Sequence, residues 1–174
     1  MNADDLQRRA AGITMILFDV DGVLTDGKLL MHPDGSESKQ FDIKDGTGLV
    51  WAQRAGLKVG LLSARSSAAT AQRAAQLGIT IVHQGVPSKL RTYDDILRHH
   101  AITDADVAYM GDDVLDLPVI ARAGLTASPA DGVEDVRTRV HYVSRAAGGH
   151  GAAREFIELI LKAQDRWERL LVHE

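Results

Sequence analysis

Short runs of β-branched and other apolar residues alternate along the chain with longer segments whose apolar residues recur at helical spacing. The runs that predict strands are residues 14–20, 57–62, 79–83, 107–110, 125–127 and 140–143. The segments that predict helices between them are residues 48–55, 67–77, 88–100 and 115–123. This alternation predicts an α/β fold, a Rossmann-like doubly wound parallel sheet with helices on both faces. Such sheets bind ligands beyond the carboxyl ends of their strands, so we expect the functional residues there.

Two segments depart from this alternation. Residues 27–42 predict two short strands around the turn HPDG (32–35), and we expect a short protruding β-hairpin. Residues 152–172 predict a final amphipathic helix, whose apolar stripe packs either on the sheet of its own chain or on another subunit. The intervals between the motifs described below have no room for a cap domain, so we expect one domain over residues 1–174.

Composition narrows the possible functions. With 174 residues, 45% of them hydrophobic, the chain can bury the core of one domain. A formal net charge of -4 disfavours nucleic acid as a partner, because proteins that bind its backbone are usually basic. The lack of cysteine excludes disulfides, thiolate metal sites and cysteine nucleophiles. The acidic start and the short apolar run at residues 13–18 resemble neither a signal peptide nor a membrane span, which predicts a cytoplasmic protein with no membrane partner.

The first candidate site is the run FDVDGV (18–23), where a hydrophobic strand ends in Asp19 and Asp21. Alternation along a strand points both side chains the same way. Two carboxylates that face one crevice repel each other unless a cation or a shared proton lies between them, which predicts a metal site. The alternative is an Asp-rich turn that closes the strand.

A second acidic cluster, GDDVLD (111–116), also follows an apolar strand. Carboxylate oxygens, in a chain without cysteine or a spaced histidine cluster, favour Mg²⁺, which binds through a few carboxylates, waters and substrate phosphate. Taken alone, this cluster is equally consistent with a helix N-cap and first turn. The two acidic clusters together are more specific for a metal site than either one.

Two further strand ends carry groups suited to phosphate. Ser63 offers a hydroxyl and Arg65 a cation just after residues 57–62, and Lys89 follows the strand that ends near His83. Backbone amides at a helix start would add to such an anion site. By themselves, Ser63 is more typical of a helix cap and Lys89 of a solvated surface lysine.

The order of these motifs, DxD, then Ser, then Lys, then GDDxxD, resembles that of phosphatases of the haloacid dehalogenase superfamily. Nearly the whole chain resembles the capless group that contains the phosphatases of KDO 8-phosphate, where KDO is 3-deoxy-D-manno-octulosonate. The segments that carry this resemblance are DVDGVLTDG (19–27), FDIKDGTG (41–48), AYMGDDVLDLPV (108–119) and AGGHGAAREFIELIL (147–161). It implies a Mg²⁺-dependent phosphatase of a phosphorylated sugar acid, and a homotetramer joined through the hairpin.

The resemblance also implies roles for individual residues. Asp19 corresponds to the nucleophile and Asp21 to the acid/base, and magnesium contacts fall on Asp19, the Asp21 carbonyl and Asp112. Asp113 and Asp116 would orient metal-bound water or Lys89. The residues expected to bind phosphate or the rest of the substrate are Asp21, Asp42, Ile43, Lys44, Asp45, Gly46, Ser63, Arg65, Arg73 and Lys89.

These roles imply a mechanism. With an expected pKa of about 4, Asp19 is ionised at neutral pH and attacks phosphorus, while Mg²⁺ and Lys89 neutralise the phosphoryl oxygens. Asp21 protonates the leaving sugar oxygen and then takes a proton from the water that attacks the aspartyl-phosphate. The candidates for the cation that binds the substrate carboxylate are Lys44, Arg65 and Arg73.

Departures from the pattern leave the substrate and two other classes open. Ala64 replaces a glycine that is common in relatives, at a cost of about 1 kcal/mol if the position requires positive φ. Val50 and His150 stand where some relatives carry arginine, so the substrate is KDO 8-phosphate or a related sugar acid such as a nonulosonate 9-phosphate. A signalling receiver domain is disfavoured because Lys89 precedes the second acidic cluster. A non-catalytic assembly domain is disfavoured because all four motifs are intact.

Overall fold

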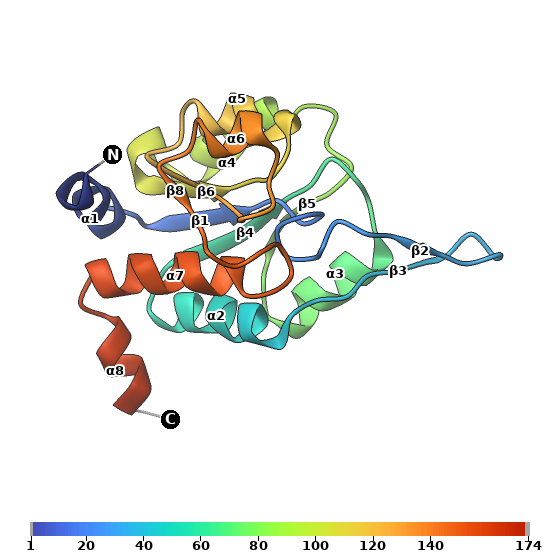
Figure 1. The fold of residues 1–174 in the computed structure, drawn as a ribbon, viewed down its shortest axis with the longest axis horizontal. Coiled ribbons are helices and arrows are strands. Elements are labelled where there is room, and N and C mark those ends of the chain that lie inside the picture. The colour runs from blue at the N-terminus through green and yellow to red at the C-terminus, as the bar shows by residue number, and fades with distance from the viewer. Residues whose placement is uncertain (1, 173–174) are drawn as a thin grey trace.

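Six parallel strands form the central sheet of the computed structural model, which describes residues 2–172 (Figure 1). The strand order is β5-β4-β1-β6-β7-β8. Chain connections run from β1 to β4 and β5 on one side and then return to β6, β7 and β8 on the other. This order places a topological switch point between β1 and β6. The strand bounds are β1 Met15–Phe18, β4 Lys58–Leu62, β5 Ile81–His83, β6 Val107–Met110, β7 Leu125–Ser128 and β8 Tyr142–Val143.

The central strands are buried on both faces. Ile16 and Phe18 of β1 join one hydrophobic cluster, whereas Met15 and Leu17 join the other. All four side chains are completely buried. Burial from two sides explains why the strands are continuous apolar runs in the sequence.

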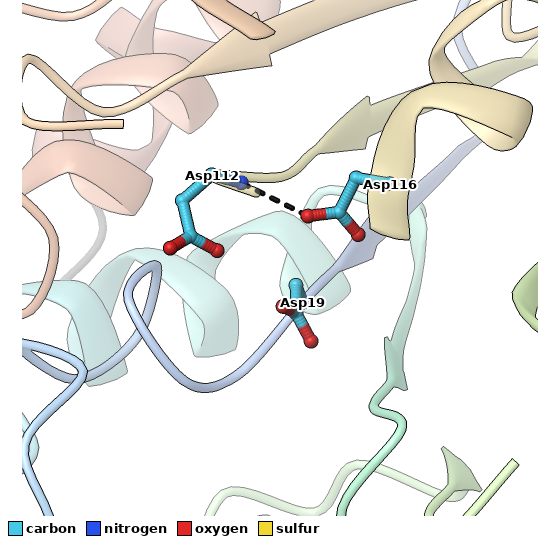
Figure 2. A group of neighbouring side chains, drawn as sticks. All are labelled: Asp19, Asp112 and Asp116. Atoms are coloured by element: carbon cyan, nitrogen blue, oxygen red, sulfur yellow. Dashed lines mark hydrogen bonds between the residues drawn. The ribbon is translucent and has the colours of Figure 1, made fainter. Parts of the chain in front are cut away.

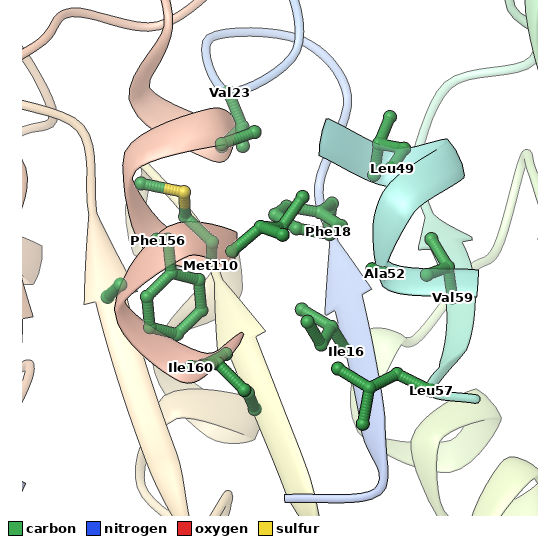
Figure 3. Close-up of a cluster of buried hydrophobic side chains, with 14 of the residues drawn as sticks. Ile16, Phe18, Val23, Leu49, Ala52, Leu57, Val59, Met110, Phe156 and Ile160 are labelled. Atoms are coloured by element: carbon green, nitrogen blue, oxygen red, sulfur yellow. The ribbon is translucent and has the colours of Figure 1, made fainter. Parts of the chain in front are cut away.

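Helices cover each face of the sheet. On the first face, α2 (Ile43–Arg54) and α7 (Ala152–Ala163) lie side by side, and their side chains meet those of β1 and β6 (Figures 1 and 3). The helices α1 (Ala3–Ala11), α3 (Ala68–Gln76) and α8 (Trp167–Val172) contribute to the same cluster. The second face is covered by α4 (Lys89–His100), α5 (Leu117–Ile120) and α6 (Glu134–Arg137).

The predicted hairpin projects from the body of the molecule (Figure 1). It consists of the antiparallel strands β2 (Leu30–Met31) and β3 (Glu37–Ser38). In the turn between them, the Asp34 carboxylate accepts a hydrogen bond from the N–H of Ser36 at 2.9 Å. The predicted fold class, a doubly wound α/β sheet with a protruding hairpin, is therefore confirmed. Among residues 2–172, each helix is too short or too polar to span a membrane.

The final helix differs from the prediction because it is broken. It ends at Ala163, and α8 begins at Trp167. Asp165 between them has a φ of 53°, in the left-handed region, which Asp tolerates better than most residues do. The break brings the Trp167 ring edge-on to Trp51 of α2, with 5.3 Å between ring centroids. Most of the apolar stripe therefore packs within its own chain, whereas Leu171 at its end is 51% exposed.

Other boundaries also differ from those predicted. The helix expected at residues 48–55 begins at Ile43, because the Asp42 carboxylate accepts hydrogen bonds from the first N–H groups of α2. The helix expected at residues 115–123 starts as a 3₁₀ turn, Val114–Asp116, and continues as the shorter α5. Helices α1 and α6 were not predicted, and each buries a single residue completely.

Candidate active site

The predicted motifs follow strands that end around the switch point. Asp19 follows β1, and its N–H donates to the Met110 carbonyl at 3.0 Å, which extends the pairing of β1 with β6. Ser63 follows β4, and its N–H donates to the His83 carbonyl at 2.9 Å. Lys89 begins α4, just after β5. Parallel pairing thus carries these side chains to one edge of the sheet.

A cavity of about 250 Å³ opens at this edge. It contains most of the residues for which the sequence predicted catalytic or metal-binding roles. The lining residues are Asp19, Asp21, Gly27, Ser63, Ala64, Arg65, Lys89, Asp112, Asp113 and Leu115.

Three carboxylates converge in this site, as Figure 2 shows. Asp19, Asp112 and Asp116 each place an oxygen within 4.8 Å of the others. Burial, followed by the charges of Asp19 and Asp116, raises the pKa of Asp112 to about 8. Burial and the Asp116 charge also raise the pKa of Asp19 to about 6, although Lys89 acts in the opposite direction. Burial thus holds the pKa of Asp19 above the expected value of about 4, and the group is still mostly ionised at neutral pH.

Lys89 supplies positive charge to these acids. Its Nζ lies 2.9 Å from Asp19 Oδ1 and 2.6 Å from Asp116 Oδ1. Burial acts to lower the pKa of Lys89, but the two carboxylates outweigh it and hold the pKa above its ordinary value. The Tyr109 hydroxyl donates to Asp116 Oδ1 at 2.5 Å, and two backbone N–H groups donate to Oδ2 at 3.0 and 3.2 Å. Both oxygens of Asp116 are thus engaged, and the residue holds Lys89 in place.

The residues present fit a divalent cation. Three carboxylates share one buried lysine, which leaves excess negative charge. Within residues 2–172, buried Asp112 Oδ1 has no hydrogen-bond partner, a state that an additional ligand would relieve. Carboxylate oxygens without sulfur or imidazole suit Mg²⁺. Because Asp116 is already saturated with donors, Asp19 and Asp112 are the side chains left to hold the ion.

Gly22 lets the loop after Asp19 approach the second acidic cluster. Its φ is +89°, and a Cβ at this position would lie 2.0 Å from Asp112 Oδ2. A side chain would therefore collide with a proposed metal ligand, in a backbone conformation that already favours glycine.

The loop after β4, predicted to bind phosphate, consists of Ser63, Ala64 and Arg65. Its backbone is unstrained. The Ser63 Oγ accepts a hydrogen bond from the N–H of Arg65 at 3.2 Å. In the described part of the chain, the residues that combine a side chain with positive φ are Ala101 and Asp165. Ala64 therefore adopts an ordinary conformation, and the replacement of glycine carries no backbone penalty here.

Several predicted substrate residues lie elsewhere. Lys44 is exposed, and Ile43 is 78% exposed. Of the three cations considered for the substrate carboxylate, the structure brings Arg65 to the catalytic cavity and places Arg73 at a different one. That second cavity is small and largely apolar, and its lining includes Leu24, Phe41, Asp42, Asp45, Gly46 and Arg73.

Asp45 joins two helices. Its carboxylate accepts hydrogen bonds from the N–H groups of Gly151 at 3.2 Å and Arg154 at 2.8 Å, at the start of α7. Burial raises the pKa of Asp45 to about 6. The side chain thus ties the first turn of α2 to the first turn of α7, a long-range contact that its position in the sequence does not reveal.

Lys39 and Glu37 are candidate functional residues that sequence reasoning missed. Lys39 Nζ lies 2.6 Å from Asp21 Oδ1, and the Lys39 side chain is 1% exposed. The cation nearest to Asp21 in this structure thus comes from the hairpin. In the sequence, Lys39 is one charge within the polar stretch SESKQFD (36–42), and no periodicity distinguishes it.

Comparison with known proteins identifies close relatives, although no family model matches the chain. KdsC of Yersinia pestis, a 3-deoxy-D-manno-octulosonate 8-phosphate phosphatase, is 40% identical over 166 residues, 95% of this chain and 89% of the relative. The crystal structure of the Moraxella catarrhalis phosphatase of that name, in complex with magnesium, phosphate and KDO, has a TM-score of 0.96 at 34% identity and covers 98% of both chains. The cobalt-bound enzyme from Haemophilus influenzae (YrbI) has a TM-score of 0.87 at 36% identity, over 90% of this chain and 92% of that one.

The sheet order, the acidic site at its switch point and these likenesses define a phosphatase of the haloacid dehalogenase superfamily. The two alternative classes considered from the sequence, a receiver domain and a non-catalytic assembly domain, are thereby disfavoured. The chain belongs to the family of KDO 8-phosphate phosphatases.

Proposed function

We propose that the chain hydrolyses KDO 8-phosphate to KDO and inorganic phosphate in a Mg²⁺-dependent reaction that supplies KDO for lipopolysaccharide precursors. The observation that carries the proposal is the position of Asp19, whose carboxylate lies 2.9 Å from Lys89 in a cavity that Ser63 and Asp112 also line. The Moraxella relative, crystallised with magnesium, phosphate and KDO, supports the choice of metal and substrate.

Asp19 is the nucleophile of the first step. Its carboxylate oxygen attacks phosphorus, the bond from phosphorus to the sugar oxygen breaks, and an aspartyl-phosphate forms. Lys89 neutralises charge on the phosphoryl oxygens, and the Ser63 hydroxyl donates a hydrogen bond to them. Arg65, with half of its side chain exposed at the cavity, is the cation best placed to receive the substrate carboxylate.

Asp19, the backbone carbonyl of Asp21 and Asp112 would hold the magnesium ion. When bound, the ion supplies positive charge that stabilises the phosphoryl group in the transition state. Asp116 keeps Lys89 directed at Asp19, and Asp113, which lines the cavity, would orient water at the ion.

Asp21 transfers protons in both steps. In the first step its carboxyl gives a proton to the departing sugar oxygen. In the second step the resulting carboxylate takes a proton from the water that attacks phosphorus, the bond from Asp19 to phosphorus breaks, and inorganic phosphate leaves.

A substrate panel tests the proposed function. Phosphate release is measured with KDO 8-phosphate, sialic-acid 9-phosphates and simple hexose phosphates, and we expect the highest kcat/KM for KDO 8-phosphate. A preference for a nonulosonate 9-phosphate would reassign the substrate, and no preference for any sugar acid would defeat the KDO assignment.

Two substitutions test the roles of the first acidic pair. Asp19→Asn should eliminate turnover, because an amide is a poor nucleophile and a weaker ligand for magnesium. Asp21→Asn should keep phosphate and magnesium binding but lower the rate by about 10²- to 10⁴-fold. Near-normal steady-state activity in Asp21→Asn would remove Asp21 from the acid/base role.

We also propose a homotetramer assembled through the hairpin. Leu30 and Met31 are 62% and 60% exposed on β2. A ribbon with two residue pairs is marginal in isolation, and packing against its copies would bury this apolar tip. Light scattering on the wild type and on a Leu30→Ser, Met31→Ser double variant tests this. We expect a tetramer that the double variant dissociates, whereas a monomeric and fully active wild type would refute the assembly.

A further inference from the structure

Four charged side chains form a closed ring of ion pairs where the hairpin meets the domain. Lys39 Nζ lies 2.6 Å from Asp21 Oδ1 and 3.8 Å from Glu37 Oε1. Arg65 closes the ring, with Nη2 3.0 Å from Glu37 Oε2 and Nε 3.8 Å from Asp21 Oδ2. The charges alternate in sign, so each acid has two cationic neighbours.

The ring joins three segments of the chain. Asp21 belongs to the loop after β1 and Arg65 to the loop after β4, whereas Glu37 and Lys39 come from the returning arm of the hairpin. The Lys39 side chain is 1% exposed, in contrast to 50% for Arg65. An ammonium group is unfavourable in a buried position unless it is paired. Its pairing with Asp21 therefore fixes both the lysine and the carboxylate.

The two oxygens of Asp21 have different surroundings. Oδ1 accepts the hydrogen bond from Lys39. Oδ2 is buried and accepts no hydrogen bond from residues 2–172, since Arg65 Nε at 3.8 Å is beyond hydrogen-bond reach. Asp21 also lines the catalytic cavity. Oδ2 is therefore the oxygen without a hydrogen-bond donor, a state that a proton-bearing group on a bound substrate or water would relieve.

We propose that Lys39 is a positioning residue for the acid/base: by occupying Oδ1 of Asp21, it fixes the carboxylate so that Oδ2 faces first the leaving sugar oxygen and then the attacking water. This inference rests on the proposed function, because it assigns a role within that reaction. Lys39 acts through Asp21 and does not contact the reacting atoms. The hairpin thereby contributes to the chemistry of its own chain.

A defect in acid positioning depends on the leaving group. The sugar alkoxide is a poor leaving group and needs the proton from Asp21, whereas p-nitrophenolate departs without one. Loss of Lys39 should therefore slow the first chemical step for KDO 8-phosphate and spare that step for p-nitrophenyl phosphate. A general loss of folding or phosphate binding would slow both substrates.

Lys39→Met tests this, because it removes the charge and keeps an unbranched side chain. Lys28→Met is the matched control, since Lys28 lies in the same hairpin just before β2 and has 86% of its side chain exposed. Rapid quench measures KDO release in the first turnover, and the p-nitrophenol burst measures the same step for the aryl substrate. For Lys39→Met we expect KDO release to fall about 10- to 100-fold and the p-nitrophenol burst to change by less than about 3-fold. Lys28→Met should match the wild type, and Lys39→Arg should recover part of the KDO rate.

A double variant tests whether Lys39 acts through Asp21. In an Asp21→Asn background, Lys39→Met should have little further effect, because the carboxylate that it positions is gone. Equal losses on both substrates, an additive loss in the double variant, or unchanged KDO release would each overturn the proposal. If Lys39→Met does not fold, Lys39→Gln is put through the same comparison. Failure of the proposed function is a separate outcome, in which the wild type itself releases neither KDO nor p-nitrophenol.

Discussion

Without metal, the fold should become less stable as the pH rises, and the acidic site sets the size of the effect. Burial and the charges of Asp19 and Asp116 raise the pKa of Asp112 from 3.8 to about 8. In the unfolded chain these influences disappear, and the carboxyl group returns to its ordinary pKa. Between these two pKa values the folded state binds a proton that the unfolded state lacks. The contribution of Asp112 to the free energy of unfolding is therefore greatest at low pH and is lost as the pH rises to about 8.

The magnitude follows from the proton affinity. Each pH unit in this window lowers the free energy of unfolding by about 1.4 kcal/mol for one group, so full ionisation of Asp112 costs up to about 6 kcal/mol. Above about pH 7, other groups contribute little. Asp19 and Asp45, with pKa values of about 6, are mostly ionised there, and His100 and His141, whose pKa values burial lowers, are neutral. From about pH 7 to about pH 9 the expected loss is about 1.4 kcal/mol.

Urea unfolding in the presence of EDTA, over this pH range, measures the effect. Asp112→Asn is the control, because it keeps the shape of the side chain and removes its titration. The variant should show a level free energy of unfolding between about pH 7 and about pH 9. Saturating Mg²⁺ should stabilise the wild type more at the higher pH, since the ion competes with the proton for the same carboxylates.

Two results would refute this reasoning. The first is a metal-free stability that stays level or rises over the same range, which would mean that Asp112 is already ionised at neutral pH. The second is an identical decline in Asp112→Asn, which would assign the titration to another group.

Two other predictions concern the framework of the site. Asp116→Asn should lower the free energy of unfolding by about 3–5 kcal/mol and reduce kcat. Lys89, a tyrosine hydroxyl and two backbone N–H groups all donate to the Asp116 carboxylate, and an amide cannot accept from all four. Unchanged stability in urea unfolding would contradict this. Gly148→Ala should lower the free energy of unfolding by about 3 kcal/mol and slow turnover, because the new Cβ would lie 1.8 Å from the Gly22 carbonyl oxygen. Gly12→Ala is the control, since its new Cβ would have its nearest atom at 3.7 Å. In thermal melting, Gly12→Ala should stay within about 0.5 kcal/mol of the wild type.

The placement of the site was predictable because a parallel sheet brings the carboxyl ends of its strands to one edge. Asp19, Ser63 and Lys89 each follow a buried apolar run, and so does Asp112. Their order along the chain therefore predicted that they would meet, and the structure places all four on one cavity. The fold class was predictable for a related reason, since two-sided burial makes each central strand a continuous apolar run.

Features that depend on distant contacts could not be predicted. Asp45 caps a helix that begins more than one hundred residues later, as its bond to Arg154 shows, and no local pattern marks the pairing. The break at Asp165 occurs in a run without glycine or proline, so the helical spacing predicted one continuous helix. Lys39 resembles any surface lysine until the hairpin folds back and buries it beside Asp21.

The hairpin connects assembly with acid/base chemistry. Its tip carries the exposed Leu30 and Met31, and its returning arm carries the buried Lys39. Two residue pairs between β2 and β3 are too few to fix the returning arm of the hairpin. The ion-pair ring holds this arm at the end near the domain. Packing of the hairpin tip against the tips of other subunits would hold it at the other end. Dissociation by Leu30→Ser with Met31→Ser should then slow first-turnover KDO release while sparing the p-nitrophenol burst, as Lys39→Met does. A dissociated variant that releases KDO at the wild-type rate would show that the ring alone positions Asp21.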